Sequence, residues 1–224
     1  MAIADFNAVL TGLILAVNLP VETPWWMCVI GALFAVLIVK PMKCLNPALS
    51  AKCFLMILFA KEFVTKSNPI QLLNEGESID LFRVMIGNAE GSIGTTSMIA
   101  IMVGAAFLVL MEVIDVRTPI AYIITFVLFL ICFSPYGLDV NYIVAHLCAE
   151  SLMLGAWFMA TDYTTSPITK MGKILYGILL GIFTGVLRVF LGFTDGVILA
   201  ILLGNLAVPV LNMITKKIGR RRLA

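Results

Sequence analysis

Two ionisable side chains, His146 and Glu150, interrupt a mainly apolar stretch at 143–160. Their spacing of four residues would place both on the same face of a helix. An imidazole and a carboxylate in this arrangement could relay protons, or polarise the ring of a bound quinone or flavin. A buried pair that satisfies only itself would give the same spacing, and so would a register that leaves one of them near the membrane surface.

Two polar runs, at 159–170 and 91–97, lie between apolar stretches. The first could cap a helix or coordinate an ion or a phosphate. The second opens a long apolar stretch, where backbone N–H groups at a helix start would be free for an anion, although a simple helix-entry turn has the same composition. The candidate side chains for an ion or flavin environment in these runs are Asp162, Thr165, Ser166, Thr95 and Thr96.

No other motif for catalysis is present in the sequence. Arg188 and Asp195 are expected to form a local ion pair at the membrane interface. The single histidine and the scattered cysteines offer no metal-binding spacing, and neither a P-loop nor a dinucleotide glycine fingerprint occurs. We therefore expect no metal site, no catalytic residue and no nucleic-acid partner in this chain.

The composition predicts an all-α integral membrane protein. Hydrophobic residues make up 61% of the chain and charged residues 12%, and the mean hydropathy is +1.06. Membrane-crossing segments must satisfy their own backbone, which favours helices. Short and proline-flanked segments indicate broken or tilted helices. Eight candidate segments lie at 8–19, 25–39, 48–60, 92–113, 119–133, 143–160, 173–192 and 196–214.

The distribution of basic residues predicts the topology of one transmembrane domain spanning 1–224. If every segment crosses the plasma membrane, both termini lie in the cytoplasm, and 215–224 forms a basic cytoplasmic tail beside the lipid headgroups. The loop at 61–91, which carries five of the 13 acidic residues, then lies outside. The basic residues expected on the cytoplasmic side, besides the tail, are Lys40, Lys43, Lys52, Arg117, Lys170 and Lys173.

Several strings, taken in order, resemble one family across nearly the whole chain. These strings are TGLILAVNLP at 11–20, PWW at 24–26, NPAL at 46–49, GN at 87–88 with GSIGTTS at 91–97, and FMATDYTTSPIT at 158–169. They are similar to RnfD, a membrane subunit of Rnf complexes, and to its relative NqrB in the sodium-pumping NADH:quinone reductase. The polar run between two apolar segments at 158–169 is the most specific of the five.

The resemblance implies a subunit of an ion-translocating oxidoreductase that passes electrons between ferredoxin and NAD through flavins and iron–sulfur clusters. Other membrane and cluster-binding subunits would be its partners, and NAD and ferredoxin would bind only to those partners. The family carries FMN esterified to a threonine, with riboflavin as a further possible flavin. The corresponding loop reads TKSNP at 65–69, so Asn68 occupies the acceptor position and Thr65 and Ser67 are possible substitutes.

The sequence also departs from the family pattern. An amide cannot form the phosphoester that a threonine hydroxyl forms, the glycine-rich hairpin before Asn46 is shortened, and the chain begins late relative to the family. These departures indicate a shortened or degenerate relative. Two alternatives follow: a structural or assembly subunit that has lost its covalent flavin, and a channel or transporter for ions or small solutes. In each case the isolated chain is not expected to be an enzyme.

Overall fold

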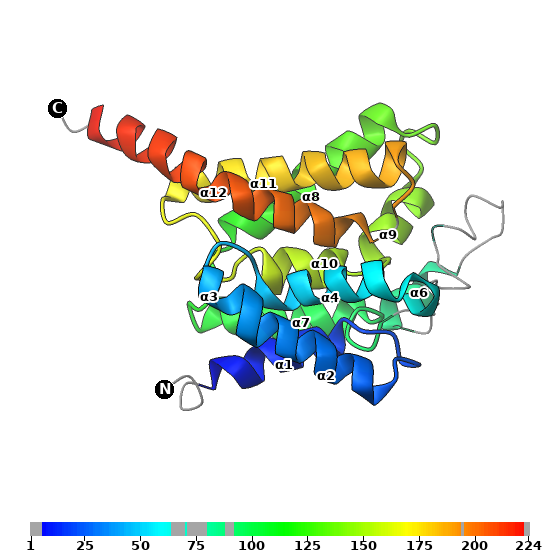
Figure 1. The fold of residues 1–224 in the computed structure, drawn as a ribbon. Helices are drawn as coiled ribbons and strands as arrows, with labels where there is room; N and C mark the ends of the chain where they lie inside the picture. Colours follow the sequence, from blue (N-terminus) through cyan, green and yellow to red (C-terminus); the bar gives the residue numbers. More distant parts are fainter. Residues whose placement is uncertain (1–5, 64–69, 71–79, 88–91, 194, 222–224) are drawn as a thin grey trace.

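The computed structural model describes residues 6–63, 70, 80–87, 92–193 and 195–221. In this part of the chain the regular elements are helices, and the apolar stretches of the sequence form them (Figure 1). They are α1 (Asn7–Val17), α2 (Trp25–Leu33) continuing through a π-helical segment (Phe34–Val39) into α3 (Lys40–Met42), α4 (Pro47–Leu58), a 3-10 turn (Ala60–Phe63), α6 (Leu81–Ile86), α7 (Met98–Leu110), α8 (Arg117–Phe133), α9 (Val140–Cys148), α10 (Leu152–Leu154) followed by a π-helical segment (Gly155–Met159), α11 (Lys170–Gly185) followed by a π-helical segment (Val186–Phe190), and α12 (Gly196–Arg221).

The prediction of an all-α membrane protein is confirmed, with several helices shorter than a full span. Three helical stretches of the described residues are long and apolar enough to cross a membrane: Trp25–Met42, Lys170–Phe190 and Gly196–Lys217. The bent pair Val140–Cys148 and Leu152–Met159 adds a fourth if it is one broken span. At about 1.5 Å per residue, the shorter apolar helices α1, α4, α7 and α8 do not reach ~30 Å by themselves, with the 17-residue α8 the nearest.

Local sequence signals explain where the helices begin. Asn46 precedes Pro47 at the start of α4, and its side-chain oxygen accepts hydrogen bonds from the backbone N–H groups of Ala48 and Leu49. Proline fits the first helical position because its missing N–H would have no partner there. Asp139 caps α9 and Thr169 caps α11 in the same way. Such caps are worth about 1 kcal/mol each.

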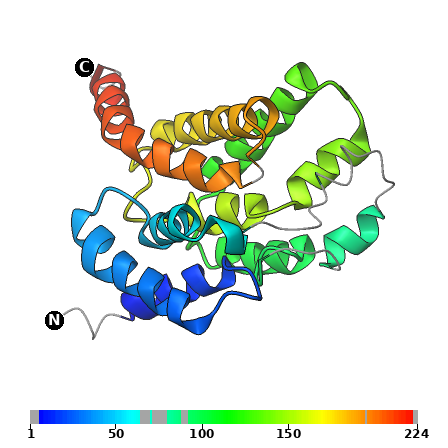
Figure 2. The same cartoon turned by 45° about the vertical axis from the view of Figure 1, so that its right-hand side comes forward.

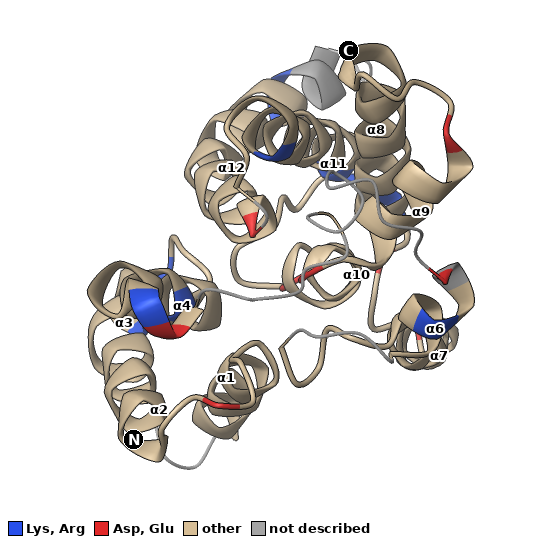
Figure 3. Ribbon diagram, turned by 90° about the vertical axis from the view of Figure 1, so that its right-hand side faces the viewer, with Lys and Arg blue, Asp and Glu red and all other residues tan. Residues whose placement is uncertain are grey.

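The helices form two groups that meet in the interior. Helices α1, α2 and α4 pack on one side, and α8, α11 and α12 pack on the other (Figures 1 and 2). Along the view of Figure 3, α10 lies between the two groups, while α4 and α12 contact each other directly. The larger core contains Tyr122, Phe126 and Leu130 of α8, which are fully buried. The broken helix is therefore enclosed by protein on several sides.

The connection between α7 and α8 is tied to α11 by Asp115. Its carboxylate accepts hydrogen bonds from Arg117 Nη1 and Lys173 Nζ, both at 3.0 Å. Burial alone would raise the pKa of Asp115, but the Arg117 backbone N–H and the two cations together lower it below the ordinary value. The carboxylate therefore stays ionised and holds the α7–α8 turn on α11.

Small residues allow α8 and α11 to approach closely. Gly177, Gly181 and Gly185 recur every four residues along α11. A Cβ atom at Gly181 would lie 2.7 Å from Thr125 Cβ and 2.9 Å from the backbone nitrogen of Phe126. Helices in lipid gain little from the hydrophobic effect when they associate, because the lipid tails are as apolar as the side chains. Close backbone approach at small residues provides the van der Waals contacts that hold such helices together.

Replacing Gly181 with alanine is expected to destabilise the protein because the new methyl group would push α11 away from α8. We expect the Tm of the purified chain in detergent to fall by roughly 5 °C. Gly12→Ala in α1 is the matched control, since a Cβ there meets nothing within 4 Å. It should leave the Tm unchanged or raise it, because alanine favours helix. Equal effects of both variants would contradict the close-packing role of Gly181.

Candidate functional site

A helix break between α9 and α10 forms the centre of the candidate site. Helix α9 ends at Cys148, Ala149 is extended with ψ 142°, and Glu150 adopts the left-handed conformation with φ 55°. The two helical parts are bent by 65° relative to each other. The prediction that His146 and Glu150 share one face of a continuous helix is therefore wrong, because the backbone leaves the helical path between them.

A buried ion pair crosses from α4 to the start of α12 beside this break. Lys52 Nζ lies 3.0 Å from Asp195 Oδ2 and 3.5 Å from Ser151 Oγ. Ser151 Oγ in turn donates to Asp195 Oδ1 at 3.3 Å. Only 1% of the Lys52 side chain is exposed, so the expectation that Lys52 faces the cytoplasm is wrong. The charge of Asp195 also complements the N-terminal end of α12, which begins at the next residue.

Arg188 binds the C-terminal end of α9. Its Nη1 donates to the carbonyl of His146 at 2.6 Å and its Nη2 donates to the carbonyl of Ala149 at 3.1 Å. The guanidinium also lies over the ring of Phe126, 5.5 Å from its centroid. With 6% of Arg188 exposed, the guanidinium is enclosed by protein and does not extend into solvent, while its location at the membrane interface stays a prediction. A cation is favourable at this position because the last carbonyls of a helix carry partial negative charge.

The ring of His146 is enclosed by aromatic side chains. It is 1% exposed, with its centroid 4.4 Å from the Tyr142 ring and 6.3 Å from the Phe126 ring. Among the described residues, no hydrogen-bond partner is found for either ring nitrogen. The structure therefore links His146 to the site through its backbone carbonyl, rather than through the imidazole on which the predicted relay with Glu150 depends.

The polar run at 159–170 forms a closed turn. Asp162 Oδ2 accepts hydrogen bonds from the hydroxyls of Thr164 at 2.9 Å and Thr165 at 3.2 Å, and Oδ1 accepts from the Thr164 N–H at 3.2 Å. The backbone N–H of Ser166 donates to the Asp162 carbonyl at 3.0 Å. The predicted residues Asp162, Thr165 and Ser166 thus lie together in a turn, and the predicted helix cap in this run is made by Thr169 at the start of α11.

The run containing Thr95 and Thr96 packs on the end of α1. The N–H of Ile93 donates to the Leu19 carbonyl at 3.2 Å, and the N–H of Gly94 donates to the Val17 carbonyl at 2.7 Å. These two N–H groups are therefore not available to an anion. Thr95 is 2% exposed and its hydroxyl donates to the Ser92 carbonyl, as expected for a helix-entry turn rather than an open site.

A second polar contact joins α4, α11 and α12. With its amide nitrogen toward Tyr176 Oη, at 2.6 Å, the Asn205 side chain accepts a hydrogen bond from the backbone N–H of Asn46 at 3.1 Å. Tyr176 and Asn205 are both buried. Together with the ion pair of Lys52, this contact connects the two helix groups through polar atoms.

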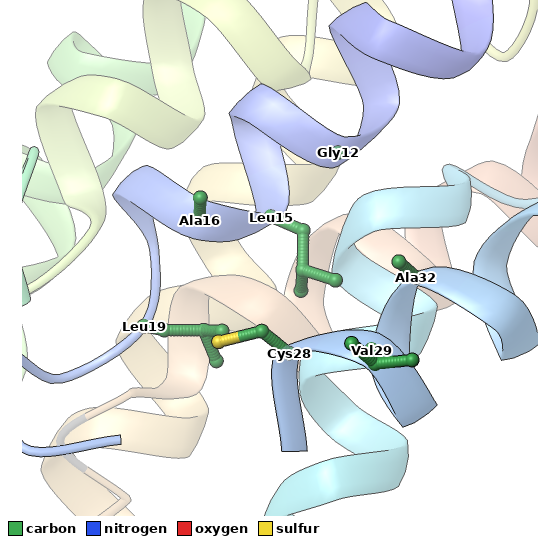
Figure 4. A pocket seen from close by; sticks show the side chains of 7 residues that line it. All are labelled: Gly12, Leu15, Ala16, Leu19, Cys28, Val29 and Ala32. Atoms are coloured by element: carbon green, nitrogen blue, oxygen red, sulfur yellow. The ribbon is translucent and has the colours of Figure 1, made fainter. Parts of the chain in front are cut away.

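An apolar pocket between α1 and α2 provides a contrast to the charged site. The side chains of Cys28, Leu15 and Leu19 line it with small neighbours, as Figure 4 shows. Its full lining is Gly12, Leu15, Ala16, Leu19, Cys28, Val29 and Ala32. Because none of these side chains is charged or carries an oxygen or nitrogen, the pocket has no side-chain group for an ion or a flavin phosphate.

Three predicted residues, Thr65, Ser67 and Asn68, lie outside the described residues. Asn68 does not fit covalent attachment of FMN, because an amide cannot form the phosphoester. Within the part of the chain that the structure describes, no group of three or more histidine, cysteine or acidic residues could hold a metal ion.

Sequence reasoning missed the role of Lys52, Ser151 and Asp195. A signal for Lys52 was present, because a charged residue within an apolar span is costly unless it is paired. The partner could not be deduced, since Asp195 lies 143 residues further along the chain.

The fold and this site define a helical membrane protein with a buried ion pair at a broken helix. The model of the NQR2, RnfD, RnfE family matches residues 1–219, and the chain belongs to this family. It is 35% identical over 240 residues to the D subunit of the Na(+)-translocating ferredoxin:NAD(+) oxidoreductase complex of Acetobacterium woodii, covering 97% of this chain and 73% of that protein.

Two further relatives are D subunits of complexes named ion-translocating oxidoreductase. The protein of Haemophilus influenzae strain Rd is 28% identical over 275 residues, covering 96% of this chain and 77% of its own length. The protein of Vibrio atlanticus is 29% identical over 273 residues, covering 96% of this chain and 78% of its own length. The predicted family is therefore confirmed.

Removing the guanidinium of Arg188 is expected to destabilise the broken helix. Arg188→Met would leave the carbonyls of His146 and Ala149 buried without their donor, and we expect the Tm to fall by roughly 10 °C. Arg83→Met is the control, because the Arg83–Asp80 ion pair has side chains 71% and 58% exposed. That change should lower the Tm by less than about 2 °C. A loss for Arg188→Met as small as the control's would argue against a capping role.

Proposed function

We infer that this chain is a membrane subunit of an Rnf-type complex that couples electron transfer to ion translocation. The observation that carries this inference is the match to Rnf-type membrane subunits along nearly the whole chain, at 35% identity to the Acetobacterium woodii protein. Partner subunits would hold the iron–sulfur clusters and would bind ferredoxin and NAD. The chain itself would contribute helices of the ion-conducting assembly and the surfaces that join those partners.

The proposed topology places both termini in the cytoplasm of a multi-pass protein of the plasma membrane. Support comes from the basic residues at the ends of described helices, including Lys40, Lys43, Lys170 and Lys173. Lys52 does not add to the excess of basic residues on the cytoplasmic side, because it is buried. The loop at 61–91 would lie on the opposite side, where the family attaches its flavin.

A flavin role is proposed only in a noncovalent form, or through a substitute acceptor at Thr65 or Ser67. The chemistry of Asn68 favours the alternative of a subunit that serves assembly or ion conduction without covalent FMN. The polar atoms of the described site are largely committed to one another, so no flavin contact is assigned to them.

Loss of this chain is expected to abolish the coupled activity of the complex. Inverted vesicles from cells lacking the gene should show no ferredoxin-dependent reduction of NAD and no accompanying ion uptake, and expression of the wild-type chain should restore both. Uptake by liposomes that contain the isolated chain and no redox partner would instead indicate a channel or transporter. Unchanged coupled activity in the deletion strain would contradict the inference.

Asn68 offers a separate test of flavin attachment. The wild-type chain, expressed with its neighbouring subunits, should give no flavin fluorescence in a denaturing gel, whereas Asn68→Thr should give a fluorescent band if the acceptor hydroxyl alone is missing. Asn68→Ala is the matched control and should stay dark. A fluorescent wild-type band would show that Thr65, Ser67 or another residue accepts the flavin. A dark Asn68→Thr band would favour the subunit without covalent flavin.

A further inference from the structure

The break between α9 and α10 has the geometry of a cation site. Where a helix is interrupted inside a membrane protein, its free carbonyls and its negative C-terminal end commonly coordinate a cation. The carbonyls of His146 and Ala149 lie at such an end. Here they are bound by the guanidinium of Arg188, at 2.6 Å and 3.1 Å. A cation carried by a side chain thus fills the first half of the break.

The second half of the break is filled in the same way. Asp195 and Ser151 present a carboxylate and a hydroxyl oxygen to one point, which the ammonium group of Lys52 occupies at 3.0 Å from Asp195 and 3.5 Å from Ser151. Hard oxygen ligands of this kind suit small inorganic cations. The Lys52 ammonium is itself a compact monovalent charge. It therefore occupies the point that the oxygen atoms of Asp195 and Ser151 share.

The cation and its carboxylate ligand come from different helix groups. Lys52 belongs to α4 in one helix group, whereas Asp195 precedes α12 in the other. The flexible four-carbon stem of the lysine carries the charge across the boundary between the groups. The Lys52 side chain is 1% exposed and the Asp195 side chain 18%, so the desolvation cost falls mainly on the lysine, and the 3.0 Å contact with Asp195 offsets it. In this chain Lys52 supplies the cation that Asp195 contacts.

We propose that Lys52 is a tethered cation that fills a monovalent-cation site formed by Asp195 and Ser151, and that the site accepts sodium when the Lys52 ammonium is absent. Lys52 is then the residue that excludes alkali cations from this position. The proposal concerns the chain's own side chains and goes beyond the assignment to an Rnf-type complex. It holds or fails independently of that assignment.

The test compares the full chain and its Lys52→Met variant in detergent, in sodium chloride and in choline chloride of equal ionic strength. The wild type should have the same Tm in both salts. Lys52→Met should lose roughly 10 °C in choline, because the largely enclosed carboxylate of Asp195 loses its cationic partner at 3.0 Å. Sodium should restore at least half of that loss, since a ligand that binds the folded state stabilises it.

Two variants show that the sodium effect comes from this site. Lys52→Met/Asp195→Asn removes both charges and should fold with no difference between the salts. Lys173→Met breaks the partly exposed pair with Asp115 and should likewise show no sodium-specific rise. A Lys52→Met variant that folds only in sodium supports the proposal. A Lys52→Met variant with the same Tm in both salts, or one that folds in neither, overturns it.

Discussion

The ion pair between Lys52 and Asp195 is the contact on which the arrangement of the two helix groups depends. In an apolar protein a buried charge has a large desolvation cost, which is offset only by a partner held at short distance. The pair joins α4 to the beginning of α12 at 3.0 Å. Because the Lys52 side chain is 1% exposed and has its anionic partner in the other helix group, the pair favours the relative position of the two groups that brings both residues together.

The broken helix and the buried charges depend on each other. The break exposes carbonyls of α9 that would otherwise bond within a longer helix, and Arg188 satisfies two of them. Ser151, on the other side of the break, contacts both members of the ion pair. A continuous helix would leave Arg188 without these acceptors and would move Ser151, so the local distortion and the charge arrangement form one unit.

Sequence reasoning performed well for features set by local chemistry. The apolar segments and the helix cap in the run at 159–170 follow from residue type and from neighbours a few positions away. It failed where helical periodicity was assumed to continue. The backbone turns at Ala149 and Glu150, which leaves His146 on α9 and Glu150 in the turn after it. The stretch contains no proline or glycine that would have predicted this turn.

The sequence by itself determined that the chain is a helical membrane protein of the RnfD family, because hydropathy and short motifs depend only on residue order. It also determined that Asn68 lacks the hydroxyl group of a covalent flavin acceptor, since that is a property of one side chain. The tertiary structure alone decided that Lys52 is buried and that Asp195 is its partner. Contacts between residues far apart in the chain depend on how helices pack, and packing is a property of the assembled bundle that no local pattern contains.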